Sequence, residues 1–86
     1  MADDTLQTDL ADALRKRLTV IGDRALYAAD PERHLAELRS ASERITALEE
    51  LLPANTHPQL RHYFERRSYD KALAWIEHEG LTASAR

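Results

Sequence analysis

The sequence predicts an all-α protein in which residues 1–86 form one small domain. Only two glycines and three prolines interrupt the 86 residues, so most of the chain is free to form helix. Apolar residues recur three or four positions apart, which is the spacing of an amphipathic helix. Pro31, Pro53 and Pro58 fall where helices would start or stop. We therefore expect an antiparallel helical hairpin followed by two short C-terminal helices.

The first helix is expected over residues 5–29. Its main apolar stripe contains Leu6, Leu10, Leu14, Leu18, Ile21, Ala25 and Ala28. A second stripe, formed by Ala13, Val20 and Tyr27, lies roughly opposite. Two apolar faces predict two neighbours, and the second neighbour is either the C-terminal helices or another subunit. Gly22 weakens the helix interior by about 1 kcal/mol relative to alanine, and it permits either a close helix crossing or a local kink.

The second helix is expected over residues 31–52. Asp30 can cap free backbone amides, and Pro31 suits the first helical position. A coiled-coil-like seam follows from two sets of residues at heptad spacing: Leu38, Ile45 and Leu52, and His34, Ala41 and Leu48. Pro53 ends this seam. Because the connection to the first helix is short, the two helices should run antiparallel.

Two short helices are expected over residues 57–66 and 69–79. Thr56 and Gln59 fit a capping box at the start of the first. The apolar residues after position 67 would face another direction on one continuous helix, so we expect a break there. Ser68 is placed to cap the last helix, which ends at Gly80. The tail, residues 81–86, should be frayed.

The apolar inventory of the chain predicts self-association. Leu, Ile, Val and Phe together number 18, about 21% of the chain, which is low for a domain with 31% charged residues. A chain this short also buries only roughly 60 to 65% of the surface of its unfolded form. A second subunit would bury apolar area that one chain cannot. We therefore expect a homodimeric helical bundle with Ala13, Val20 and Tyr27 at the interface.

Several classes of site find no support in the sequence. Disulfides and thiolate metal sites are excluded because the chain contains no cysteine. Of the four histidines, only His34, together with Glu37, has a spacing suited to metal ligation from a helix, so we expect no metal or cofactor. No serine lies in a recognisable nucleophile motif, so we expect no catalytic residues. The chain has no apolar run of about 20 residues, and the N-terminus is acidic, so we expect a cytoplasmic protein without a membrane span.

The strongest candidate for a binding surface is the Arg/aromatic segment, residues 57–76, which holds four of the five aromatic residues. Its rings could equally form the core. We expect a division, with Phe64, Tyr69, Leu73 and Ile76 inside and Tyr63 and Trp75 nearer the rim. The junction of Arg66, Arg67 and Ser68 could grip an anion, or Ser68 could simply cap its own helix. The candidate residues for binding a partner or an anion are Arg61, Tyr63, Arg66, Arg67, Ser68, Lys71 and Trp75.

The function that these patterns favour is a non-catalytic protein-interaction or assembly module. The expected partner is a second copy of the chain, and another protein is the second candidate. The alternative is a small nucleic-acid- or anion-binding protein that uses the Arg/aromatic segment. Nucleic acid is the weaker choice, because the net charge is −3 and the pI is about 5.7.

Overall fold

The all-α class predicted from the sequence is confirmed. A computed structural model describes residues 2–81 of the chain, and the side chains of residues 5–81. Within this part of the chain there are five helices and no strand. They are α1 (Ala2–Ile21), α2 (Arg24–Ala29), α3 (Pro31–Glu49), α4 (Pro58–Glu65) and α5 (Tyr69–Glu79).

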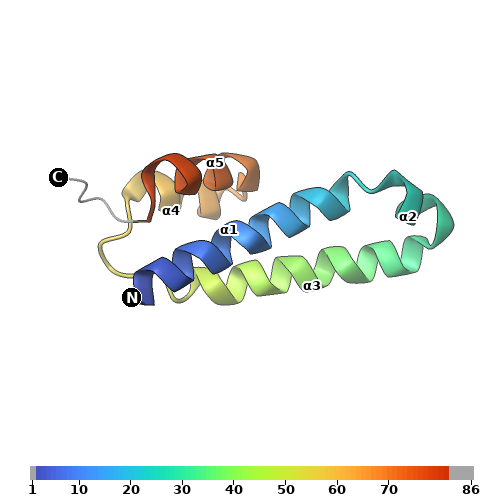
Figure 1. Ribbon diagram of the computed structural model, residues 1–86, viewed down its shortest axis with the longest axis horizontal. Coiled ribbons are helices and arrows are strands. Elements are labelled where there is room, and N and C mark those ends of the chain that lie inside the picture. The colour runs from blue at the N-terminus through green and yellow to red at the C-terminus, as the bar shows by residue number, and fades with distance from the viewer. Residues whose placement is uncertain (1, 82–86) are drawn as a thin grey trace.

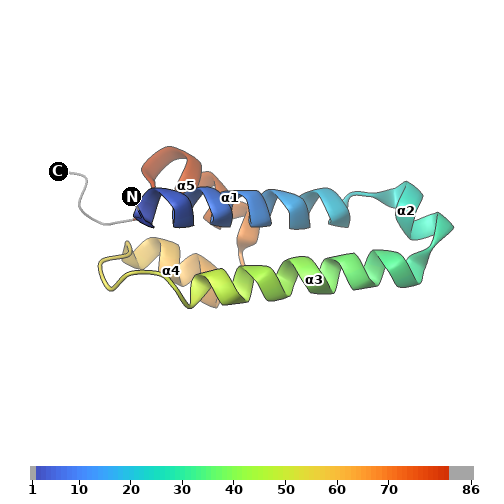
Figure 2. The ribbon, with the colours of Figure 1, turned by 60° about the horizontal axis from the view of Figure 1, so that its bottom comes forward.

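The two long helices α1 and α3 lie side by side and run in opposite directions (Figures 1 and 2). The short helix α2 connects them at one end of the molecule, while α4 and α5 pack together at the other end (Figure 1). The molecule is therefore elongated, with principal dimensions of 48 × 20 × 19 Å. Because α4 and α5 reach only part of the way along α1 and α3, the rest of the long pair stands uncovered (Figure 2).

The single helix predicted over residues 5–29 is wrong, because the chain breaks after Ile21 and resumes helix at Arg24. The Asp23 carboxylate accepts a hydrogen bond of 3.0 Å from the Leu26 backbone N–H and so caps α2. Because glycine has a low helix propensity, the first helix is weak at Gly22, and the cap at Asp23 lets a new helix begin there instead. Of the two outcomes left open for Gly22, the structure has a break, which goes further than a kink.

The second long helix, α3, begins at Pro31 as expected, and ends at Glu49, earlier than the predicted residue 52. The Asp30 carboxylate accepts a hydrogen bond of 3.1 Å from the Arg33 backbone N–H. The predicted capping box at Thr56 is wrong, because the Thr56 hydroxyl donates to the Pro53 carbonyl at 2.7 Å. The cap of α4 is His57, whose Nδ1 accepts from the Gln59 N–H at 3.1 Å.

The last helix, α5, ends at Glu79, and the φ of 81° and ψ of −163° at its C-cap Gly80 turn the chain back toward the body of the protein. Leu81 follows with only 2% of its surface exposed, and its carbonyl accepts a 3.0 Å hydrogen bond from the His57 N–H. Leu81 is therefore part of the core, which corrects the expectation of fraying from residue 81. The rest of that tail, residues 82–86, lies outside the described residues.

The hydrophobic core lies where all the major helices meet, a region that we call the core end. Its buried residues are Leu10, Ala11, Ala13, Leu14, Ile45, Leu48, Leu60, Phe64, Tyr69, Ala72, Ile76 and Leu81. Arg17 lies at the boundary of this region. Its guanidinium is 4.9 Å from the Tyr69 ring centroid, and its Nε donates to the Ser42 hydroxyl at 3.1 Å. The opposite end, residues 18–38, is called the tip.

Candidate interaction surfaces

Two adjoining pockets lie on the surface formed by α4 and α5. The first, the basic pocket, measures about 460 Å³ and is lined by Gln59, His62, Tyr63, Arg66, Ser68 and Lys71. The second, the aromatic pocket, measures about 350 Å³ and is lined by Tyr63, Lys71, Ala74, Trp75, His78 and Glu79. Tyr63 and Lys71 line both, so the two pockets share a wall.

Most of the candidate residues from the Arg/aromatic segment belong to these pockets, but two do not. Arg61 donates from its guanidinium to the Pro53 carbonyl at 2.7 Å. Arg67 donates to the Tyr69 hydroxyl at 3.1 Å, from a backbone with a positive φ of 57°. The neighbouring residues Arg66 and Arg67 therefore do not converge on one ligand, and only Arg66 lines the basic pocket. Ser68 precedes α5 without a side-chain cap hydrogen bond, and it lines the same pocket.

The rings of the Arg/aromatic segment are divided between core and surface. Phe64 and Tyr69 are each 3% exposed, whereas Tyr63 and Trp75 are only partly buried. The Trp75 ring lies 4.5 Å from the His57 ring and 6.3 Å from the Tyr63 ring, measured between centroids. Its Nε1 is buried and has no hydrogen-bond acceptor among the described residues. The Trp75 ring, in contact with two neighbouring rings, therefore forms one wall of the aromatic pocket.

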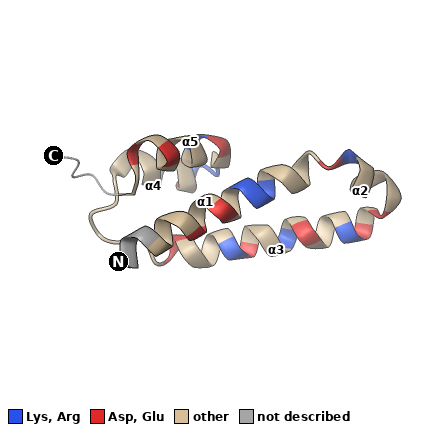
Figure 3. Ribbon diagram, viewed as in Figure 1, with Lys and Arg blue, Asp and Glu red and all other residues tan. Residues whose placement is uncertain are grey.

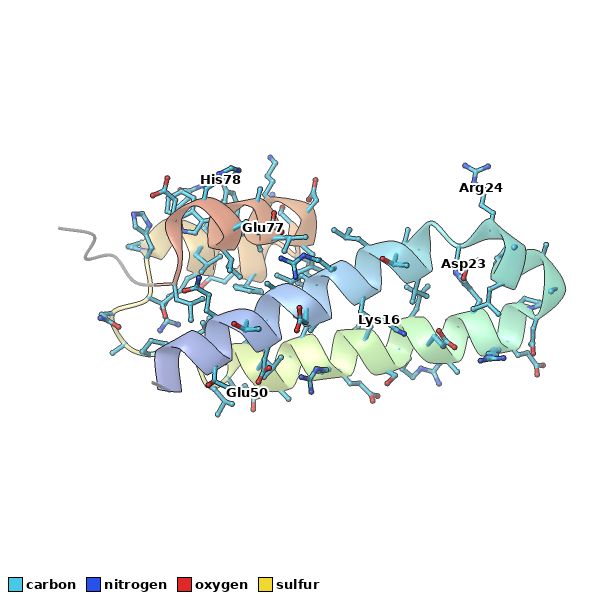
Figure 4. The ribbon with its side chains drawn as sticks, in the orientation of Figure 1. Lys16, Asp23, Arg24, Glu50, Glu77 and His78 are labelled. Atoms are coloured by element: carbon cyan, nitrogen blue, oxygen red, sulfur yellow. The ribbon has the colours of Figure 1, made fainter. Side chains whose placement is uncertain are left out.

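Charges are distributed differently on the basic pocket and on the long helices. Along α3, basic and acidic residues alternate (Figure 3), and Arg33 pairs with Glu37 at 3.3 Å. Arg15 on α1 pairs with Glu77 on α5 at 2.9 Å, and Figure 4 shows Glu77 close to α1 while His78 points outward. The lining of the basic pocket contains no carboxylate. Within the described part of the chain, the side chains of Arg66 and Lys71 form no ion pair or hydrogen bond.

A second candidate surface is the tip. Only Val20 and His34 are buried among its residues, and α2 buries none of its six. The large apolar side chains of Ile21, Tyr27 and Leu35 are 47%, 62% and 54% exposed. The tip is held by the His34 ring, whose Nε2 donates to the Val20 carbonyl at 2.7 Å and whose ring meets Tyr27 edge-on at 5.4 Å.

The three residues expected at a dimer interface are separated by the fold. Ala13 and Val20 are 3% and 4% exposed, so they are buried within their own chain and do not offer a surface to a second subunit. The reason is that α1 packs against both α3 and α5, which occupy the two sides that its apolar stripes require. Only Tyr27 remains exposed, because the helix break places it on α2 at the tip.

The remaining titratable groups give few further candidates. Within the described residues, no group of three or more His, Asp or Glu side chains is arranged to hold a metal ion. Burial raises the pKa of the Glu49 carboxyl at the end of α3. The positive charge of Arg67 opposes this shift, and the negative charge of Glu50 adds to it, leaving the pKa above its usual value of 4.5.

Several residues that line the pockets were not among those predicted from the sequence, although helical spacing was a signal for some of them. Gln59 and His62 lie seven and four positions before Arg66, the C-cap of α4, so all three share one side of this helix and its end. In the same way, Lys71, Ala74 and His78 share one face of α5. The spacing shows which residues share a face, but the packing of α4 on α5 decides that the two faces meet.

Comparison with known proteins gives no match to a family model, a curated protein or a solved structure. None of the helices in the described part of the chain is long and apolar enough to cross a membrane.

Proposed function

We propose that this protein is a non-catalytic interaction module that associates with a second copy of itself through the tip. The observation that carries the proposal is the exposure of Ile21, Tyr27 and Leu35 at an end of the molecule that has almost no core of its own. Three large exposed apolar side chains at one end of the molecule favour a protein contact there, because burying them removes apolar area from water.

The form of the α1 surface supports a helical partner. Leu10, Leu14, Arg17 and Ile21 are four, three and four residues apart and so follow one line along α1. The α4–α5 pair covers this line as far as Arg17, which touches Tyr69 at the start of α5. Ile21 continues the line beyond the covered part. A second pair of helices would cover the tip in the way that α4 and α5 cover the core end.

The charges at the tip support a second copy as that partner. Residues 18–38, which form the tip, carry Arg24 and Arg33 and also Asp23, Asp30, Glu32 and Glu37. Charges of both signs allow a two-fold interface in which each arginine meets a carboxylate of the other copy. The same mixture would repel neither copy strongly, which a surface of one sign would do.

Sedimentation equilibrium from micromolar to millimolar concentration tests the proposal. The wild-type mass should rise toward that of two chains as concentration increases. Leu35→Glu should weaken association about tenfold or more, because a charge would be buried twice in a two-fold interface. Leu51→Glu is the matched control, since Leu51 is 66% exposed but follows α3 at the core end. Circular dichroism should show that both variants keep their helix content.

Two results would reject self-association through the tip. One is a wild-type protein that remains a single chain at millimolar concentration. The other is an equal loss of association in Leu35→Glu and Leu51→Glu, which would mean that any added negative charge weakens association by general repulsion.

A further inference from the structure

We propose that the basic and aromatic pockets together bind an organic phosphate monoester. The phosphate lies in the basic pocket near Arg66 and Lys71, and the apolar body of the ester lies against Tyr63 and Trp75 in the aromatic pocket. This site is at the core end and is separate from the tip, so its test is independent of self-association.

The basic pocket has positive charge that the protein itself does not neutralise. Arg15 and Arg33 each pair with a carboxylate, whereas Arg66 and Lys71 pair with none in the described part of the chain. No carboxylate lines the pocket, although the whole chain carries a net charge of −3. An anion placed between Arg66 and Lys71 would gain charge-assisted hydrogen bonds.

The number of donors favours a phosphate over a carboxylate. Every residue that lines the basic pocket has a side chain able to donate a hydrogen bond: Gln59, His62, Tyr63, Arg66, Ser68 and Lys71. A phosphate monoester presents three strongly accepting oxygens and a charge of about −1.5 to −2 at neutral pH. A carboxylate presents two oxygens and one charge, so it would use fewer of these donors.

The adjoining aromatic pocket selects an ester with an apolar body. Its wall is formed by Trp75, whose ring lies near the His57 and Tyr63 rings, and by Ala74. Lys71 lines both pockets, so its methylene stem can cover the apolar body while its ammonium meets the phosphate. Glu79 also lines the aromatic pocket, and its negative charge disfavours a second anionic group there. The arrangement therefore suits one phosphate with an uncharged aromatic or aliphatic group attached.

Two sources can supply this chemistry, namely a small free phosphate ester and a phosphorylated side chain of a protein. Both place the same phosphate in the basic pocket. They differ in whether peptide on either side of the phosphorylated residue adds contacts.

Titration followed by NMR tests the site, and Trp75 is the natural reporter because it is the only tryptophan and gives a single indole N–H signal. The probes are phenyl phosphate and inorganic phosphate at low ionic strength. Phenyl phosphate should bind about tenfold more tightly, because its ring adds apolar burial in the aromatic pocket. Phenyl phosphate should also shift the Trp75 signal, and inorganic phosphate should shift it less.

Variants assign the binding to the two cations. Arg66→Gln and Lys71→Met should each weaken phenyl phosphate binding by about threefold to tenfold. The methionine keeps an apolar chain of similar length, so Lys71→Met removes the charge and leaves the wall of the aromatic pocket. Arg39→Gln is the matched control, because it removes the same charge from an exposed position on α3 outside both pockets. It should bind as the wild type does.

Equal affinity for phenyl phosphate and inorganic phosphate would overturn the proposal, since it would leave the aromatic pocket without a role. Equal weakening by Arg39→Gln and Arg66→Gln would overturn it as well, because only general charge would then matter. A short peptide containing phosphotyrosine distinguishes the two sources. Tighter binding of the peptide than of phenyl phosphate supports a phosphorylated protein as the ligand, and equal or weaker binding supports a small ester.

Discussion

The core end and the tip are built from the same two long helices, yet they bury very different amounts of apolar surface. At the core end, α4 and α5 lie across α1 and α3, and residues such as Leu10, Leu14 and Ile45 are fully buried. At the tip, the same pair has only the short helix α2 as a neighbour, and Ile21 and Leu35 remain about half exposed. An amphipathic pair of helices thus supplies one shared seam, and a stable core requires a second layer.

This difference assigns separate tasks to the two ends. The core end supplies nearly all the packing that keeps the chain folded, and its outer surface carries the two pockets. The tip depends on a few local interactions, such as the hydrogen bond from His34 to the Val20 carbonyl. Substitutions at the tip should therefore be tolerated by the fold, while substitutions at the core end should not.

The largest expected effect comes from truncating one leucine at each end. Leu14→Ala should lower the free energy of unfolding by about 2 to 5 kcal/mol, because Leu14 is 0% exposed and its removal leaves a cavity. Leu35→Ala should change it by less than about 1 kcal/mol, because Leu35 is 54% exposed. Urea unfolding followed by circular dichroism measures both values.

Equal costs at the two positions would break the comparison, since they would show that the tip is as tightly packed in solution as the core end. The measurement should be made at a concentration where the chain is a single copy. Association through the tip would otherwise add to the cost of Leu35→Ala.

The two glycines provide the next test, with an expected difference in sign. Gly80→Ala at the core end should cost about 1 to 3 kcal/mol, because its φ of 81° and ψ of −163° suit glycine almost alone. An added Cβ would also meet the Gln7 side-chain oxygen at 3.3 Å. Gly22→Ala near the tip should stabilise the protein by up to about 1 kcal/mol, because its Cβ would meet only ordinary contacts of 3.7 and 3.8 Å.

Thermal unfolding of the two variants gives the comparison, and Gln7→Ala separates the causes at Gly80. If the backbone conformation dominates, Gly80→Ala should remain costly after Gln7 is shortened. A destabilised Gly22→Ala protein would contradict the expectation and would mean that the break after Ile21 needs glycine.

Much of the fold could be predicted because local signals agreed with tertiary packing. Asp30 and Pro31 begin α3, and Ser68 and Gly80 flank α5 at the expected positions, although the Ser68 side chain forms no cap hydrogen bond. The first helix was predicted too long because the apolar spacing continues through Gly22 and outweighed the weaker signal of Asp23 as a cap. The apolar spacing alone does not mark where a helix ends, whereas a single capping side chain can end it.

The candidate surfaces were less predictable because they depend on which helix lies beside which. The stripe containing Ala13 and Val20 correctly indicated a second neighbour for α1, but no pattern in the sequence distinguishes a helix of the same chain from a helix of another. Arg66 and Arg67 are adjacent in sequence, yet Arg67, with its positive φ, donates to the Tyr69 hydroxyl while the Arg66 side chain lines the basic pocket. The sequence therefore indicated the Arg/aromatic segment as a candidate surface, but it could not show which of its residues line the basic pocket.

The smallest expected effect concerns Glu49, which tests whether burial at the core end reaches the last turn of α3. Burial raises the pKa of the Glu49 carboxyl in the folded chain above 4.5, the usual value that it keeps when unfolded. The folded state then holds the proton more tightly, so this stabilisation is present below about pH 4.5 and is lost as pH rises through the folded pKa. At neutral pH the charged form is disfavoured by burial, and Glu49→Gln should raise the free energy of unfolding by a few tenths of a kcal/mol.

The gain from Glu49→Gln should shrink as the pH falls to about 4.5, because the wild-type side chain becomes neutral as well. Urea unfolding at both pH values measures the difference, and Glu43→Gln on the same helix corrects for the change in net charge. If the gain in stability from Glu49→Gln instead grew as the pH fell, the pKa of Glu49 in the folded chain would lie below its usual value. That result would indicate a favourable ion pair between Glu49 and Arg67. The end of α3 would then resemble the solvated tip, and the core end would stop short of it.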